Sequence, residues 1–201
     1  MEEKLPANPK GIRAVVEKHG QILFNIFLFV LFSVVVGKDV YEKWSGGKLD
    51  YVEIAFVAQN LIMVTFILIR KQHQSVDRNL LHQAVAMIAF FSGAAIFGQP
   101  ATGGETAQSV SKMIIFAANV LGAITILNLG RSFGILIAYR EIKTGGLYAV
   151  VRHPMYGTDI LLRVGFIVSH FSWLNLAIVI ASTGCYLYRA VLEERFLQQQ
   201  W

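Results

Sequence analysis

Residues 146–157 combine the side chains of this chain that are best suited to chemistry. The segment reads Gly-Leu-Tyr-Ala-Val-Val-Arg-His-Pro-Met-Tyr-Gly, so a cation, an imidazole, a proline and two tyrosines lie between apolar runs. Proline suits the first turn of a helix, which predicts a helix start at Pro154. The exposed N–H groups of that turn and Arg152 would favour an anion such as a carboxylate. The alternative is an interfacial cap, in which Arg152 and Tyr156 anchor a helix among lipid headgroups.

A second candidate is the acidic pair Glu193-Glu194. Successive helical residues point about 100° apart, so the two carboxylates cannot serve one ligand in the same way. One carboxylate could bind a cation while the other pairs with Arg189 or Arg195 at helical spacing. Taken alone, the pair is more typical of a solvated helix end.

Long apolar runs must position both candidates. The chain is 55% hydrophobic and 15% charged, whereas a soluble domain carries about 25% charged residues. Since the clear runs are close to the length that crosses a ~30 Å hydrocarbon core, the sequence predicts an all-α polytopic membrane bundle with about six spans. The last two spans form a C-terminal helical hairpin. The expected spans are residues 21–36, 51–69, 80–97, 113–129, 158–169 and 174–188.

The spacing of these runs predicts one membrane domain, residues 20–201, after a polar N-terminal arm at residues 1–19. The domain divides into four N-terminal spans (20–130) and a C-terminal region (131–201) that holds both candidates. Residues 131–152 mix apolar and charged side chains, so we expect an interfacial or partly buried segment. The last helix should continue beyond the membrane, which would place the glutamate pair one to two turns past its edge.

The distribution of Lys and Arg predicts the orientation. With the N-terminus inside, the outer loops hold only Lys38, Lys43, Lys48 and Lys112, and most other basic residues fall in inner segments. Under the positive-inside rule, both termini and both candidates are then cytoplasmic. The scattered basic residues argue against a nucleic-acid partner. The histidines lack metal-ligand spacing, so no metal is expected, and the single Cys185 excludes an internal disulfide framework.

Polar residues inside the apolar runs are expected to have structural roles. Asp159 and Arg163 are one helical turn apart, which predicts an ion pair within the bundle. Asn119, Asn128 and His170 are expected to form hydrogen bonds between helices.

Three features, taken in order, resemble the isoprenylcysteine carboxyl methyltransferase and phospholipid N-methyltransferase family of integral membrane enzymes. They are Gly-x-Tyr at Gly146 and Tyr148, Arg-His-Pro-x-Tyr at residues 152–156, and the glutamate pair after a helical hairpin. The resemblance covers about residues 129–197. Family members usually continue with a basic, aromatic tail, whereas this sequence reads Arg-Phe-Leu-Gln-Gln-Gln-Trp after Glu194, so the substrate stays open.

The resemblance implies methyl transfer from S-adenosylmethionine, bound on the cytoplasmic side, to a lipid-like or prenylated substrate that enters from the bilayer. Carried over by position, the catalytic residues would be Arg152, His153 and Glu194. Either Glu193 or Glu194 would meet the charged amino-acid end of the cofactor. The cofactor-binding residues implied are Tyr148, Arg152, His153, Pro154, Tyr156, Glu193 and Glu194.

The chemistry of this cofactor agrees with these residue types. Helix N–H groups and Arg152 suit its carboxylate, a glutamate suits its ammonium, and tyrosine faces suit its sulfonium. A carboxylate acceptor needs no general base, whereas a protonated amine must first lose a proton, to His153 or to a glutamate.

Two other functions remain open. An NADPH-dependent lipid or sterol reductase would need a site for the 2′-phosphate, for which the chain offers Arg131, Arg140 and Lys143. A non-catalytic membrane scaffold or a small transporter would use the motif only to anchor helices.

Overall fold

The computed structural model describes residues 12–47, 50–77, 79–95, 101–139 and 141–198. Within them the chain folds into α-helices with a pair of two-residue strands, and this confirms the predicted all-α bundle. The helices are α1 (Ile12–Ser45), α2 (Tyr51–Ile69), α3 (Leu80–Phe91), α4 (Glu105–Leu129), α5 (Pro154–Ser169) and α6 (Trp173–Gln198). The strands are β1 (Ser75–Val76) and β2 (Ala138–Tyr139), and short 3₁₀ turns are η1 (Ser92–Ala95), η2 (Gly130–Ser132) and η3 (Gly146–Ala149).

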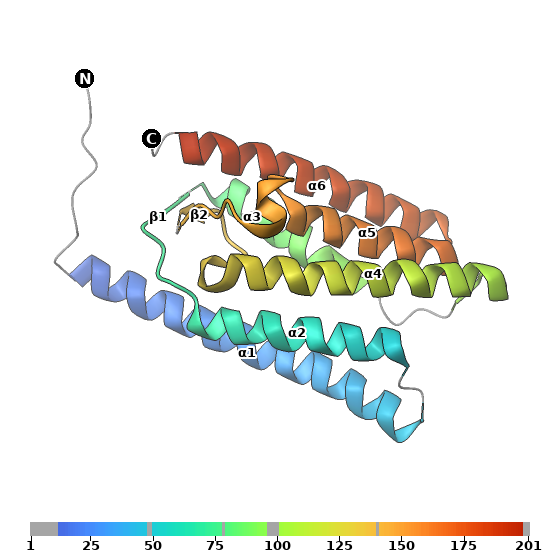
Figure 1. Ribbon diagram of the computed structural model, residues 1–201. Helices are drawn as coiled ribbons and strands as arrows, with labels where there is room; N and C mark the ends of the chain where they lie inside the picture. The colour runs from blue at the N-terminus through green and yellow to red at the C-terminus, as the bar shows by residue number, and fades with distance from the viewer. Residues whose placement is uncertain (1–11, 48–49, 78, 96–100, 140, 199–201) are drawn as a thin grey trace.

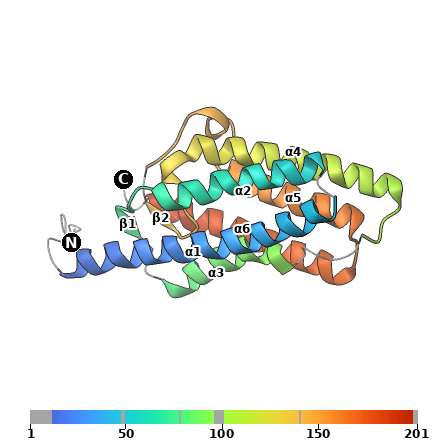
Figure 2. The ribbon, with the colours of Figure 1, turned by 90° about the horizontal axis from the view of Figure 1, so that it is seen from below.

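The helices run up and down in one closed bundle (Figures 1 and 2). Helix α2 packs between α1 and α4, α5 lies against α4, and α6 contacts both α5 and α3. The Phe32 ring of α1 closes the bundle, since it lies 5.7 Å from the Phe90 ring and 5.9 Å from the Phe91 ring at the end of α3.

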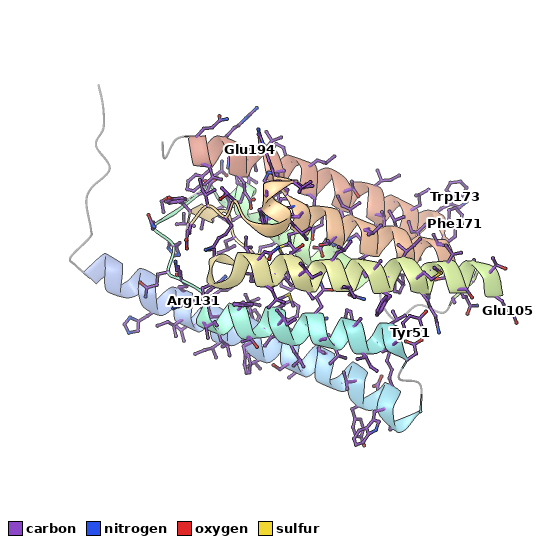
Figure 3. The ribbon with its side chains drawn as sticks, viewed as in Figure 1. Tyr51, Glu105, Arg131, Phe171, Trp173 and Glu194 are labelled. Atoms are coloured by element: carbon purple, nitrogen blue, oxygen red, sulfur yellow. The ribbon has the colours of Figure 1, made fainter. Side chains whose placement is uncertain are left out.

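The alternating directions give the bundle two distinct ends. Figure 3 shows Arg131 and Glu194 at one end, which we call the site end, and Tyr51, Glu105 and Trp173 at the other. Helix α1 begins and α6 finishes at the site end (Figure 1). Both sequence candidates therefore lie at the same end, as the predicted topology requires.

Four of the helices are long and apolar enough to cross a membrane: His19–Ser45, Tyr51–Ile69, Glu105–Ser132 and Trp173–Gln198. Six complete spans were expected, but α3 has 12 residues and α5 has 16. At 1.5 Å per residue they extend only about 18 Å and 24 Å, less than a ~30 Å core. The chain is an integral membrane protein, and two of its helices are shorter than a full crossing.

Some boundaries differ from those expected. Helix α1 begins at Ile12, so residues 12–19 are helical rather than part of an arm, and residues 1–11 lie outside the described residues. The apolar run 80–97 breaks at Ser92, where α3 gives way to η1, and residues 96–97 lie outside the described residues. The predicted extension of the last helix is confirmed, because α6 runs on to Gln198.

Large apolar side chains cover the outside of the bundle, as a lipid environment requires. Leu23, Ile54, Met113 and Ile180, from the four spanning helices, are each more than half exposed. A continuous apolar surface of this kind is unusual on a soluble monomer.

The segment between η2 and β2 closes the site end. Phe133, Ile135 and Ile137 are fully buried and alternate with residues that face the other way, as in an extended strand. Phe133 and Ile135 join the main core with residues of α1, α2 and α4. The Gln83 side chain pairs with both the N–H and the carbonyl of Ile137, at 3.1 Å and 3.0 Å. The prediction of a partly buried segment is confirmed for this stretch.

Arg163 explains why α3 can end inside the bundle. Its guanidinium donates to the carbonyl of Ala89 at 2.9 Å and to the Ser92 hydroxyl at 3.3 Å. A cation at a helix C-terminus matches the negative end of the helix dipole. Arg163 also lies 4.0 Å from the carboxylate of Asp159, so the predicted ion pair is confirmed.

The predicted hydrogen bonds between helices are not all found among the described residues. Asn119 is buried, yet neither of its amide atoms makes a hydrogen bond among the described residues. His170 bonds the neighbouring Ser169 hydroxyl at 2.7 Å, within the turn that follows α5. Asn128 instead packs against the backbone of Gly146. The expectation is wrong for Asn119, because burial is set by the packing of α4 and gives no assurance of a partner.

Arg163→Met should lower the free energy of unfolding by about 3 kcal/mol, because removal of one partner leaves Asp159 charged and buried. Unfolding in detergent with increasing dodecyl sulfate measures it. Arg195→Met, at an exposed position of α6, is the control and should change the value by less than about 0.5 kcal/mol. If Arg163→Met and Arg195→Met lower the free energy of unfolding equally, Arg163 does not stabilise the end of α3 inside the bundle.

Candidate functional site

A half-open cleft of about 190 Å³ lies at the site end. It is enclosed by the segment 132–143, by η3 and the start of α5, and by the last turns of α6. Its walls are largely apolar, with polar groups gathered on one side. The polar side chains that line it include Tyr139, Glu141, Lys143, Tyr148, Arg152, His153, Tyr156, Arg189 and Glu193.

Helix α5 presents its N-terminus to this cleft. The helix begins at Pro154, as predicted, and His153 is the residue that caps it. The His153 side chain makes no capping hydrogen bond to the first turn of this helix. The first N–H groups of a helix have no partner within it and carry partial positive charge, so they offer donors to an anion.

The imidazole of His153 lies between the two glutamates. Its Nε2 is 3.2 Å from Glu194 Oε1, and its Nδ1 is 3.9 Å from Glu193 Oε2. Arg152 adds a weaker contact, 3.6 Å from Glu194, with a side chain that is 84% exposed. The hairpin of α5 and α6 thus brings the motif and the glutamate pair together.

The structure separates the two glutamates. Glu193 lines the cleft, whereas Glu194 is not among the lining residues. The Glu193 side chain is 22% exposed and that of Glu194 is 40% exposed. Glu193 accepts a hydrogen bond of 3.0 Å from Nε of Arg189, which confirms the predicted pairing of one glutamate with Arg189. One glutamate therefore faces the cleft and the other holds the His153 ring from outside.

Arg189 connects the elements around the cleft. Its side chain is 4% exposed, and its guanidinium donates to the carbonyls of Ala86 and Gly134, both at 3.4 Å. It also lies 5.1 Å from the centre of the Tyr156 ring. Sequence reasoning treated Arg189 only as a pairing partner. The available signal was a cation directly after the last apolar run, four residues before Glu193.

Aromatic rings form the inner wall. The His153 and Tyr156 rings are nearly parallel, at 5.2 Å and 5°, and Tyr156 leans on Tyr186 at 5.2 Å. Tyr148 lies nearer the mouth of the cleft. Burial raises the pKa of the Tyr148 phenol, and the charge of Glu193 raises it further, so this phenol stays protonated and acts as a hydrogen-bond donor. Pro154 does not line the cleft, and it acts by starting α5.

Residues 109–201 match the family described as phospholipid methyltransferase. The C-terminal region is therefore similar to that family. The match includes every residue that lines the cleft and extends back into α4. The family points to methyl transfer onto a lipid-type substrate. A search of curated proteins found no match to the chain.

The rim of the cleft is tied to the end of α2. The Glu141 carboxylate bonds Lys71 and lies 3.1 Å from Nζ of Lys143. These two lysines lower the pKa of the Glu141 carboxyl to about 2, so the link keeps its charge throughout the physiological pH range.

The cations considered for a 2′-phosphate do not gather in the cleft. Arg131 bonds the carbonyl of Ile69 at the end of α2, at 2.9 Å. Lys143 lines the cleft but is paired with Glu141, and Arg140 lies outside the described residues. Among the residues that the structure describes, no group of three His, Cys, Asp or Glu side chains could hold a metal ion.

Gly146 sets the position of η3. Its φ of +61° lies in the left-handed region, which favours glycine. A Cβ here would lie 2.3 Å from Nδ2 of Asn128 on α4. The glycine of the Gly-x-Tyr pattern therefore allows η3, and Tyr148 within it, to approach α4 closely.

Gly146→Ala should lower the free energy of unfolding by about 2 kcal/mol, through left-handed strain and crowding against Asn128. Gly145→Ala is a matched control, because Gly145 has a φ of −98° and open space around its Cα. Thermal unfolding in detergent compares them. A Gly146 variant as stable as the Gly145 variant would contradict the close approach of η3 to α4.

Proposed function

We propose that the chain transfers a methyl group from S-adenosylmethionine to a lipid-type acceptor that reaches the cleft from the bilayer. The observation that carries the proposal is the convergence, in a cleft built by the family-matched region, of the α5 N-terminus, His153 and Glu193. The clustering of Lys and Arg in the segments of the site end supports binding on the cytoplasmic side.

The groups in the cleft fit the charges of this cofactor. The N–H groups that begin α5, with Arg152, would hold its carboxylate. The Glu193 carboxylate, which lines the cleft, would hold its ammonium. The face of Tyr148 would support the sulfonium by cation–π attraction.

When bound, S-adenosylmethionine supplies a methyl group on a positively charged sulfur, open to direct displacement. The protein then contributes alignment and exclusion of water. Arg189 fixes Glu193, and the stacked His153 and Tyr156 rings form a rigid wall beside it. The buried side chains of Phe133, Ile135 and Ile137 seal the cleft from the bundle interior.

His153 is also placed to hold a proton. Its Nε2 faces the Glu194 carboxylate at 3.2 Å, and a carboxylate at one ring nitrogen orients an imidazole. An amine acceptor would need such a group, whereas a carboxylate acceptor would not.

The acceptor would approach along the apolar part of the cleft wall. Leu129, Met155 and Leu197 contribute to this wall. Val150 and Val151, just before the motif, are exposed apolar residues beside the rim. A lipid chain could remain in the bilayer while its polar end enters the cleft.

Titration calorimetry with S-adenosylhomocysteine tests the proposal. The wild-type protein should bind, and Glu193→Gln should weaken binding about tenfold, as expected for loss of a charge-assisted hydrogen bond. Glu194→Gln is the matched control, since it removes the neighbouring charge outside the cleft, and should have the smaller effect.

A parallel titration with NADPH should give no heat of binding. The proposal is refuted if the wild-type protein binds NADPH but not S-adenosylhomocysteine. If Glu194→Gln weakens binding more than Glu193→Gln, the assignment of the two glutamates is reversed.

A further inference from the structure

Two polar side chains, Asp159 of α5 and Tyr186 of α6, lie directly behind the cleft and do not line it. Tyr186 is almost fully buried, and its hydroxyl donates to the carboxylate of Asp159. Ionisable groups within an apolar bundle are costly and mark functional candidates. Neither the family motif nor the cleft geometry gives these two residues a role.

Arg163 holds this pair in place from the other side. Its guanidinium lies 4.0 Å from the Asp159 carboxylate and 4.9 Å from the centre of the Tyr186 ring. Arg163 is itself fixed by the carbonyl of Ala89 at the end of α3. The acid, the phenol and the guanidinium therefore have mutually fixed positions.

The Tyr186 ring connects these fixed side chains to the wall of the cleft. It contacts the Tyr156 ring at 5.2 Å with an angle of 32°, and Tyr156 lies parallel to His153 on its other side. Because the Tyr186 hydroxyl is held by Asp159, the far end of the Tyr186 ring is held in place against Tyr156. The Tyr186–Asp159 hydrogen bond thus restrains Tyr156 from behind, in addition to the contacts of Tyr156 itself with Glu193 and Arg189.

We propose that Asp159 and Tyr186 are positioning residues of the methyltransferase cleft, which hold the Tyr156 ring against His153. This inference rests on the proposed function for its effect on the methyl donor. Its structural part, the restraint of Tyr156, can be measured without any ligand.

The first measurement is fluorine NMR of the full chain labelled with 3-fluorotyrosine, in lipid nanodiscs, with the Tyr156 signal assigned by its loss in Tyr156→Phe. Tyr186→Phe keeps the ring and removes the hydroxyl, and Asp159→Asn keeps the shape of the acceptor. Ring flips of Tyr156 should become about tenfold faster in Tyr186→Phe, the rate change expected from one lost hydrogen bond.

The second measurement is a double-mutant cycle on S-adenosylhomocysteine affinity. Tyr186→Phe should weaken binding about fivefold, and the effect should vanish in a Tyr156→Leu background if Tyr186 acts through Tyr156. Ser111→Ala is the control: it removes a buried 2.7 Å hydrogen bond to the Gly165 carbonyl, away from the cleft. It should change neither the ring flips nor the affinity.

Unchanged Tyr156 flips in both Tyr186→Phe and Asp159→Asn overturn the inference. The inference is also overturned if Tyr186→Phe weakens S-adenosylhomocysteine binding equally with and without Tyr156→Leu. Such a result would mean that Tyr186 does not act through Tyr156. Faster Tyr156 flips in Tyr186→Phe, together with a wild-type protein that fails to bind S-adenosylhomocysteine, would support the restraint of Tyr156 and overturn the proposed function alone.

Discussion

The buried charge of Arg189 is the constraint on which the site end depends. A guanidinium in an apolar bundle is tolerated only when its donors are paired. Here α3 provides the Ala86 carbonyl, the extended segment provides the Gly134 carbonyl, and α6 provides Glu193. Pairing one cation therefore fixes the relative positions of the elements that enclose the cleft.

The need to pair buried charges also accounts for the two short helices, α3 and α5. Helix α3 ends at Phe91, where Arg163 bonds its last turn, and α5 carries Asp159 and Arg163 along its length. Polar side chains replace apolar ones in the part of the bundle nearest the cleft, while α1, α2, α4 and α6 retain the length and hydropathy of membrane spans. The full-length helices hold the protein in the bilayer, and the shorter ones position the polar groups.

Local patterns predicted part of this arrangement. Proline at a first turn gave the start of α5, helical spacing gave the Asp159–Arg163 pair, and the hairpin implied that the motif would meet the glutamates. The Arg189 contacts could not be predicted, because Ala86 is 103 residues away and its carbonyl carries no sequence signal. Hydropathy likewise gave no indication that α3 ends at Phe91, since the break depends on Arg163 from a later helix. The different positions of Glu193 and Glu194 could not be predicted either, because they depend on which face of α6 lies against α5.

The central claim is that this cleft directs methyl transfer to a lipid. The most direct measurement is incubation of the purified protein with S-adenosylmethionine labelled in its methyl group and with total membrane lipid, followed by fractionation. The account predicts label in a lipid fraction, and its loss when Glu193→Gln replaces the wild-type protein. Absence of label from every lipid fraction, with a folded protein that binds S-adenosylhomocysteine, would contradict it.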